Sequence, residues 1–569
     1  MILAPTNVDV VFESRSDLSP APLIRFDGDS MRIHFDDFGP ASYKLFLKAK
    51  RLPEFTLDFD MTETYTVSAP RRFASMLGVE PPPAPASDLP LSSFLFDDQC
   101  ELVKLGLDAK RFAVWSDCGG GKTLISLEWA RHVIHRTGGR VLVVTLNEIV
   151  QQWIEEAEKF YGELLPIIRM KSREEMREWC ASGTVGGVAV VAKLAVVNYE
   201  KFNPGAGATK TDEIVNELRH LSGIVLDESS RLANSGGKQK WAIIKSSKGI
   251  PYKLSCTATP APNDTMEFAS QASFLERMRS EGEIIWTYFI RDPKSHRWVV
   301  KNHARKAFFE FMSSWSIYVR DPKKYGWRLD LPEVPEPTII THEIKPTREQ
   351  LDAAASLITP ADGQGELFPT ADTNTIQRAK LSQVAKGFIY RKGEAAGKFD
   401  RIPSAKPKFV ADLIRQEVAA GHQVLVWTTF NAETLLILEH FIDSDFRVER
   451  LDGSTSEKDR LMLLEDFRKG RIRALVSKSS LLGYGMNFQF CRSMIFSGFS
   501  DSYVAFYQAI RRAYRFGQTE SVRVHIPVVS ELETDMLENV LCKDARMEAD
   551  IAEMETNYIA ARRATTGAA

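Results

Sequence analysis

Cysteine is scarce in this sequence and nowhere arranged like a metal or disulfide site. Six cysteines occur among 569 residues, and no two of them form a Cys-x-x-Cys pair. This spacing argues against a zinc site and against a disulfide framework, and it suits a reducing compartment.

An excess of one charge, a signal peptide and a long apolar run are also lacking. The 73 Lys and Arg residues nearly cancel the 75 Asp and Glu residues, so any basic surface for nucleic acid must be local. The first residues, MILAPTNVDVVFESRSD, lack the basic-then-apolar pattern of a signal peptide, and no run approaches the roughly 20 apolar residues of a membrane span. We therefore expect no membrane partner and a cytoplasmic location.

What the chain does contain is two sets of short apolar strands that alternate with helical stretches. Continuous apolarity suits strands buried on both faces, and strand–helix alternation implies parallel sheets with crossover helices. The expected strands are 112–115, 141–145, 188–191, 223–226 and 252–256 in the first set, and 423–427, 473–476, 494–496 and 522–528 in the second.

The other segments are predicted to be accessory. Residues 1–85 combine alternating strands with one helical stretch, and a proline-rich linker follows them. The predicted division is an N-terminal α+β accessory module (1–85), a first parallel-sheet domain with a helical insertion at its end (86–335), a basic linker or insertion (336–405), a second parallel-sheet domain (406–535) and a C-terminal helical tail (536–569).

A glycine-rich segment, Ser116-Asp-Cys-Gly-Gly-Gly-Lys-Thr123, follows the first apolar strand and opens a helical run. This is the context of a phosphate-binding loop, in which backbone N–H groups and a helix amino terminus face phosphate oxygens. Lys122 would reach the β- and γ-phosphates and Thr123 would hold Mg²⁺. The residues expected to bind ATP here are Cys118, Gly119, Gly120, Gly121, Lys122 and Thr123. A glycine-rich turn without a ligand is the alternative.

Two carboxylates, Asp227 and Glu228, end another predicted strand. Asp227 can hold Mg²⁺, and Glu228 can orient or deprotonate the attacking water; the alternative is a solvated acidic turn. The segment Ser255-Cys-Thr-Ala-Thr-Pro260 ends the next strand, where its hydroxyls could hydrogen-bond the carboxylate pair. Gln99 precedes the glycine-rich loop at a distance suited to reading adenine.

The second set of strands adds two arginines, Arg512 and Arg515, three positions apart. On a helix they would project from one face and could stabilise charge on a transferred phosphoryl group. A solvated helix face is the alternative reading.

The ordered series SDCGGGKT, DESS, TATP, GYGMNF and QAIRRAYRFGQ resembles the superfamily-2 DEAD/DEAH-type helicases, specifically their Swi/Snf-like branch, over about 90–530. The stretch 146–160 looks like the second motif of that branch, and Val197-Asn-Tyr199-Glu resembles a neighbouring strand-end motif. Several sequence segments look most like those of compact helicases encoded by phages and prophages. This likeness would place the chain in the host cytoplasm. The loop departs from the family pattern in having Ser116 for the first glycine and Gly120 for a larger apolar residue. Ser229-Ser230 replaces the usual third and fourth residues of the acidic box.

The resemblance implies two RecA-like domains in tandem, ATP and Mg²⁺ as cofactors, and catalytic roles for Lys122, Glu228, Arg512 and Arg515. It also implies nucleotide contacts from Gly485 and Gln508. The expected function is an ATP-driven translocase that remodels double-stranded DNA as a monomeric motor. The alternatives are a strand-separating or branch-migrating helicase in replication, recombination or repair, an ATPase motor of a restriction or defence system, and a non-hydrolysing binding module. RNA is a less favoured partner.

A local cluster of Lys and Arg between 378 and 408 is a candidate DNA contact, and a solvated connector is the equal alternative. Its members are Arg378, Lys380, Lys386, Arg391, Lys392, Lys398, Arg401, Lys406 and Lys408.

Overall fold

The computed structural model of the chain contains two compact units. The first comprises residues 1–329 and 548–569, and the second comprises residues 330–547. The structure describes all residues except 1–7, 11–22, 28–29, 36–38, 60–64, 80–88, 118, 204–213, 234–236, 279, 294–297, 329–333, 359–370, 392–396, 483–486, 516 and 567–569. Within the described part of the chain, no helix is long and apolar enough to cross a membrane.

The first unit is built on a seven-stranded parallel sheet with the strand order β16-β6-β13-β12-β7-β11-β8. All residues of β7, β12 and β13 are buried, as apolar strands covered on both faces require. The strands are β6 (Arg111–Ser116), β7 (Val141–Thr145), β8 (Ile167–Arg169), β11 (Leu194–Asn198), β12 (Gly223–Asp227), β13 (Tyr252–Thr257) and β16 (Ser316–Val319).

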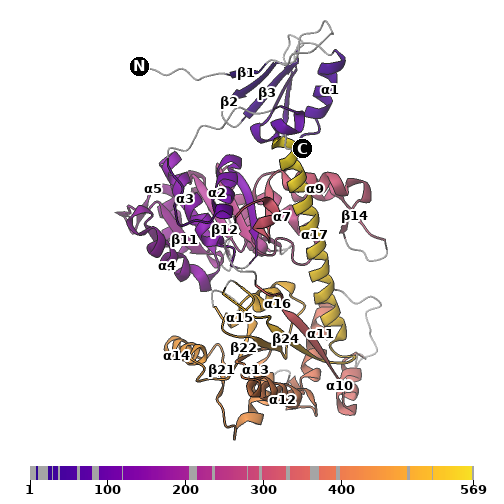
Figure 1. Cartoon of the computed structure of the whole chain (residues 1–569). Helices are drawn as coiled ribbons and strands as arrows, with labels where there is room; N and C mark the ends of the chain where they lie inside the picture. The colour runs from indigo at the N-terminus through magenta and orange to yellow at the C-terminus, as the bar shows by residue number, and fades with distance from the viewer. Residues whose placement is uncertain are drawn as a thin grey trace. The chain divides into compact units, whose positions relative to one another are not determined.

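Helices pack around this sheet in the purple to rose part of Figure 1. They are α2 (Asp97–Ala109), α3 (Lys122–Thr137), α4 (Val150–Phe160), α5 (Arg173–Ser182), α6 (Lys238–Ser246), α7 (Phe268–Phe274), α8 (Glu281–Tyr288) and α9 (Arg305–Ser313). Between α8 and α9, β14 (Phe289–Arg291) and β15 (Trp298–Val300) form a hairpin. The segment from α7 to α9 is the expected helical insertion, and β16 follows it as the edge strand of the sheet.

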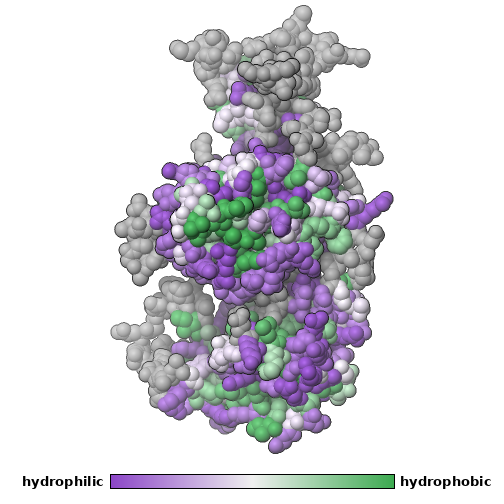
Figure 2. Space-filling model, turned by 90° about the vertical axis from the view of Figure 1, so that its left-hand side faces the viewer, coloured by the Kyte–Doolittle hydropathy of each residue, from purple (hydrophilic) through white to green (hydrophobic). Residues whose placement is uncertain are grey.

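The strand expected at 188–191 is wrong. Gly186 and Gly187 have φ values of 59° and 78°, so they turn the chain into a small hairpin of β9 (Thr184–Val185) and β10 (Val188–Ala189). The sheet strand is β11 instead, a few residues later. Val188 and Val191 remain 69% and 89% exposed. Figure 2 looks onto the side of the first unit where Figure 1 shows α4 and α5, and it shows an apolar patch among hydrophilic residues.

The amino-terminal module is an antiparallel sheet with the order β1-β2-β3-β5-β4. Met31, Ile33 and Phe35 of β3 are fully buried while Arg32 is exposed, which confirms the predicted alternation. The elements are β1 (Val8–Val10), β2 (Leu23–Asp27), β3 (Ser30–Phe35), α1 (Pro40–Ala49), β4 (Thr56–Phe59) and β5 (Tyr65–Pro70).

The second unit has a six-stranded parallel sheet with the order β17-β24-β23-β20-β22-β21, drawn mostly in orange in Figure 1. The strands are β17 (Thr338–Ile344), β20 (Val424–Thr428), β21 (Val448–Leu451), β22 (Ala474–Lys478), β23 (Ser493–Phe496) and β24 (Arg523–Val529). Its helices are α10 (Arg348–Ile358), α11 (Ala371–Ala385), α12 (Lys406–Ala419), α13 (Asn431–Leu438), α14 (Glu457–Arg468), α15 (Ser479–Leu482) and α16 (Tyr503–Ile510), and β18 (Phe388–Tyr390) pairs with β19 (Phe399–Arg401).

These two sheets confirm the expected fold class of two parallel-sheet RecA-like domains in tandem. The structure differs from the expected boundaries at two places. Strand β17 lies in the range expected to be a linker, yet it is an edge strand of the second sheet. The long helix α17 (Thr534–Thr566) begins in the second unit, and its residues from Glu548 onward belong to the first.

Candidate nucleotide-binding site

The glycine-rich segment forms a tight turn between β6 and α3. Gly121 has a φ of 73°, in the left-handed region that favours glycine, and a Cβ atom there would lie 2.2 Å from Nε2 of Gln99. Lys122 and Thr123 open α3, so their backbone amides lie at its amino terminus, a ready site for an anion. Cys118 lies outside the described residues.

The two departures of the loop itself, Ser116 and Gly120, lie side by side. A Cβ atom on Gly120 would lie 2.8 Å from the Ser116 hydroxyl oxygen and 3.2 Å from the Ser116 Cβ. The Ser116 side chain therefore fills space that a larger residue at 120 would need. The serine at 116 and the glycine at 120 therefore fit each other in this loop.

The Lys122 ammonium lies against its own loop. Nζ donates hydrogen bonds to the carbonyl oxygens of Ser116, at 2.9 Å, and Asp117, at 3.0 Å. An ammonium group needs acceptors, and these two carbonyls supply them. Phosphate oxygens would provide stronger, charge-assisted acceptors at the same position.

The acidic pair lies at the carboxyl edge of the same sheet. Asp227 ends β12 and is almost fully buried; its Oδ2 accepts hydrogen bonds from the Thr145 hydroxyl at 2.9 Å and the Trp153 indole at 2.8 Å. Burial raises the pKa of Asp227, and these two donors oppose that rise. The Tyr199 hydroxyl donates to the Asp227 carbonyl at 2.8 Å. Asp227 is therefore held rigidly by three neighbours.

Glu228 has a φ of 51°, an uncommon left-handed conformation for a residue with a side chain. Its Oε2 accepts a hydrogen bond from the Thr257 hydroxyl at 3.3 Å. The expectation that a hydroxyl of the Ser255–Pro260 segment contacts the carboxylate pair is thus confirmed. Backbone strain of this kind is concentrated at functional sites.

Further hydrogen bonds link the carboxyl ends of β12 and β13 through a buried glutamine. The Ser255 hydroxyl donates to Oε1 of Gln271 at 2.5 Å, and Gln271 Nε2 donates to the Ser229 carbonyl at 2.9 Å. Gln271 is fully buried in α7. The sequence did not predict this role of Gln271, because position 271 lies in no recognisable motif.

Gln99 is buried in α2 and accepts a hydrogen bond from the Phe96 amide at 3.1 Å through Oε1. Its Nε2 faces Gly121 of the phosphate-binding loop, as the close approach to that glycine shows. The structure thus brings Gln99 to the loop; its contact with adenine stays a prediction.

The arginines of the second unit lie beyond a helix, not on it. Helix α16 ends at Ile510, and Arg512 and Arg515 follow in a turn, so the prediction that both project from one helix face is wrong. Asn487 accepts a hydrogen bond from Arg515, and Gln508 is buried in α16. Gly485 lies outside the described residues.

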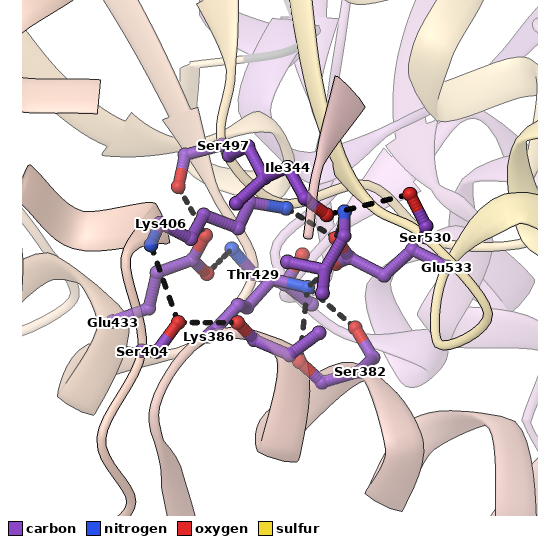
Figure 3. A network of polar contacts seen from close by, with 12 residues as sticks. Ile344, Ser382, Lys386, Ser404, Lys406, Thr429, Glu433, Ser497, Ser530 and Glu533 are labelled. Carbon is purple, nitrogen blue, oxygen red and sulfur yellow. Dashed lines mark hydrogen bonds and ion pairs between the residues drawn. The ribbon is translucent and has the colours of Figure 1, made fainter. Parts of the chain in front are cut away.

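The basic cluster of 378–408 is not a continuous exposed surface. Lys386 and Lys406 are each 1% exposed and both donate to Glu533, at 2.8 and 2.5 Å, in the network of Figure 3. Four exposed or half-buried members face acids: Arg378 with Asp501, Arg391 with Asp400, Arg401 with Glu439 and Lys408 with Asp412. The expectation that Lys386 and Lys406 contact DNA is therefore wrong, because their charge is neutralised inside the domain. Lys392 lies outside the described residues.

The residues of the first unit fit Mg²⁺ bound together with a nucleotide. Among the described residues, no group of three or more His, Cys, Asp or Glu side chains could hold a metal ion. Mg²⁺ usually takes only one or two carboxylates, and phosphates and waters complete its octahedron. Asp227 and the hydroxyl of Thr123 are the groups of this edge that suit such a site.

Two family models match the chain. Residues 95–262 match the family described as "Type III restriction enzyme, res subunit", and residues 405–517 match "Helicase conserved C-terminal domain". The first range contains Gln99, the glycine-rich loop and the acidic pair, and the second contains Arg512 and Arg515. The two matched ranges thus lie one in each of the two parallel-sheet domains.

Curated relatives match over shorter stretches. "Protein CHROMATIN REMODELING 24" of Arabidopsis thaliana is 28% identical over 123 residues, which are 21% of this chain and 11% of that protein. "Helicase SWR1" of Mycosarcoma maydis is 32% identical over 115 residues, 20% of this chain and 6% of that protein. The chain therefore matches only about a tenth or less of these relatives' length.

Among solved structures, the chain is similar to the "Sulfolobus solfataricus SWI2/SNF2 ATPase core in complex with dsDNA". The sequence identity is 18% and the TM-score is 0.37, over 82% of this chain and 95% of that one.

Proposed function

We propose that the chain is an ATP-dependent translocase that moves on and remodels double-stranded DNA. One observation carries this proposal: the loop of Lys122, the acidic pair and the Thr257 hydroxyl share the carboxyl edge of one parallel sheet, and Thr257 contacts Glu228 directly. Ligands of open parallel sheets bind at this edge.

Each group has a defined task in the proposed reaction. The amides at the start of α3 and the Lys122 ammonium bind the β- and γ-phosphates, and Glu228 orients or deprotonates the attacking water. Asp227 and Thr123 would hold Mg²⁺, which when bound offsets the negative charge of the phosphates. Arg512 and Arg515 stabilise the charge that develops on the transferred phosphoryl group. The contacts of Gln99, Gly485 and Gln508 with the nucleotide are part of the same proposal.

The preference for duplex DNA rests on the likeness of the motif series to the Swi/Snf-like branch. The likeness to phage-encoded forms and the monomeric state have the same basis. The test is ATP hydrolysis by the purified chain with duplex DNA, single-stranded DNA and RNA in parallel. Stimulation by duplex DNA is expected to exceed that by the other two, and equal or greater stimulation by RNA would contradict the proposed substrate.

The match of 95–262 to a restriction-enzyme family favours a second candidate, the motor of a restriction or defence system. Displacement of a triplex-forming strand from duplex DNA reports translocation, and unwinding of a forked duplex reports strand separation. Displacement without unwinding supports the translocase; unwinding of the fork supports a strand-separating or branch-migrating helicase. If the chain shows neither displacement nor unwinding until a nuclease partner is added, the restriction motor is favoured.

A further inference from the structure

The second half of α17 docks on the first unit through an apolar stripe. Ile551 and Met554 are each 3% exposed, and Tyr558 packs against the main core of that unit. The spacing of three and four residues places these three side chains on one helix face. Charged side chains along the same segment have partners in the first unit.

Three carboxylates of α17 pair with basic residues of the first unit. Glu555 accepts from Lys324 at 2.9 Å, Glu553 from Arg305 at 2.7 Å, and Glu548 from both terminal nitrogens of Arg320. A fourth carboxylate, Asp550, accepts from the buried Thr265 hydroxyl at 2.7 Å. Of these partners, Arg320 alone also has an ion pair with the phosphate-binding loop among the described contacts.

Arg320 reaches that loop because of the register of its strand. It follows β16, in which Val319 is paired with Ser116 of β6, so Arg320 lies beside Asp117. Arg320 Nε is 3.7 Å from Asp117 Oδ2, and the Tyr318 hydroxyl donates to Asp117 Oδ1 at 3.1 Å. The Asp117 side chain is thus held from β16.

Asp117 is also a partner of Lys122. Its carbonyl oxygen accepts from Lys122 Nζ at 3.0 Å and from the Gly120 amide at 3.1 Å. Any shift of Asp117 therefore changes the carbonyl that holds the Lys122 ammonium and the turn that holds the glycines. Contacts run without a gap from Glu548 through Arg320 and Asp117 to Lys122.

The start of α17 is anchored just as firmly in the second unit. Glu533, one residue before the helix, accepts from Lys386 and Lys406, and all three side chains are 1% exposed (Figure 3). Asp501 accepts from Asn539 at 2.9 Å through its carboxylate and from Lys543 at 2.6 Å through its carbonyl. The first part of α17 is therefore fixed within the second unit.

We propose that Arg320 and Glu548 are positioning residues that set the conformation of the phosphate-binding loop and make ATP binding sensitive to α17. This inference rests on the proposed ATPase function. Glu548 draws the Arg320 guanidinium away from Asp117, and movement of α17 changes how Arg320 is shared between the two carboxylates. The position of Asp117 then decides how readily Lys122 exchanges loop carbonyls for phosphate oxygens.

The test compares Glu548→Gln with Glu553→Gln in the full chain. Both variants remove one ion pair between α17 and the first unit, but Glu553 and Arg305 do not lead to the loop. We expect Glu548→Gln to change KM for ATP and the affinity for a fluorescent ATP analogue by roughly fivefold, the lower end of usual couplings between sites, with a smaller change in kcat. Glu553→Gln should leave both affinities within about twofold of the wild type, the effect usual for an exposed ion pair.

A charge exchange separates positioning from simple docking. In Arg320→Glu with Glu548→Arg the pair with α17 is re-formed, whereas residue 320 now repels Asp117. We expect thermal stability to return to that of the wild type while the affinity for the ATP analogue stays altered. Restored affinity in this double variant, or equal effects of Glu548→Gln and Glu553→Gln, would overturn the inference. A wild-type chain that binds no ATP analogue would instead contradict the proposed function.

Discussion

Lys122 is the residue on which the proposed phosphate chemistry depends most. Its ammonium lies 2.9 and 3.0 Å from two loop carbonyls, poised at the start of α3. Lys122→Ala removes the cation that faces the β- and γ-phosphates, and the loss of one such preorganised donor usually lowers turnover about 10²–10³-fold. Steady-state ATPase assays, with circular dichroism as the control for folding, measure the effect. Turnover close to wild type would exclude this loop as the phosphate site.

For Glu228 we expect loss of hydrolysis without loss of nucleotide binding, because its negative charge is needed only to activate the attacking water. Glu228→Gln keeps an oxygen that can accept from Thr257, so nucleotide binding should be unchanged while hydrolysis falls by about 10²–10⁴-fold, the usual contribution of a general base. Binding of a fluorescent ATP analogue and single-turnover hydrolysis distinguish the two steps. The exposed Glu163→Gln is the matched control and should behave like wild type. Normal hydrolysis by Glu228→Gln would assign the base elsewhere.

Asp227 should govern the requirement for Mg²⁺. Asp227→Asn keeps one oxygen that can accept from both Thr145 and Trp153, and it does not change the size of the side chain. The fold should therefore persist while the Mg²⁺ concentration needed for half-maximal hydrolysis rises. Titration of Mg²⁺ into chelator-treated protein measures this shift. An unchanged Mg²⁺ dependence would show that Asp227 does not hold the ion.

The sequence predicted those site residues that stand in a short recognisable motif directly after an apolar strand. Lys122, Asp227 and Glu228 follow apolar strands, and the carboxyl ends of parallel strands meet at one edge. The contacts of Trp153 and Gln271 were not predictable, because they depend on strand order and register. Nothing in a linear pattern says that an indole at 153 donates to a carboxylate at 227.

Elements were predicted well where apolar runs are continuous and poorly where glycine intervenes. The strand expected at 188–191 became a hairpin because Gly186 and Gly187 adopt positive φ, and the true strand β11 lay just beyond. Strand β17 was missed because its residues are mostly exposed or half-buried, as an edge strand permits. The position of Arg512 after α16 depends on where that helix ends, and helix ends are the least predictable feature of a sequence.

Loss of the Glu533 charge should strongly lower the stability of the second unit, because Glu533 pairs with two buried lysines. Burial alone would raise the pKa of Glu533, but Lys386 and Lys406 bring it below its usual value. Glu533→Gln leaves two buried ammonium groups short of a negative partner, and breaking such a pair usually costs about 3–5 kcal/mol. Hydrogen exchange of the amides of β20 and β24 measures this loss. The control is Glu439→Gln, which removes the exposed partner of Arg401. Equal protection of these amides from exchange in both variants would contradict the structural role of Glu533.

For the whole molecule, the sequence predicted five successive segments, whereas the chain forms two compact units. The reason is α17, whose residues from Ile551 to Tyr558 carry an apolar stripe that packs on the first unit. A tail of alternating charge and apolar residues predicts a helix. Its docking surface could not be predicted, because it depends on Arg320, Lys324 and Arg305, more than 200 positions earlier.

The proposed motor requires groups from both units to act on one ATP. Arg512 and Arg515 belong to the second unit, whereas Lys122 and Glu228 belong to the first. An arginine that acts on the transferred phosphoryl group is usually worth roughly 10³–10⁵-fold in turnover. Lys at either position should rescue only partly, because a point charge does not reproduce the planar guanidinium.

DNA-stimulated ATP hydrolysis by Arg512→Ala and Arg515→Ala, measured beside their affinity for a fluorescent ATP analogue, decides whether the two units form one motor. We predict that each variant loses most of the DNA-stimulated turnover while it binds the analogue as tightly as the wild type. Full DNA-stimulated hydrolysis in both variants would contradict the two-domain motor and leave a nucleotide-binding first unit that works alone.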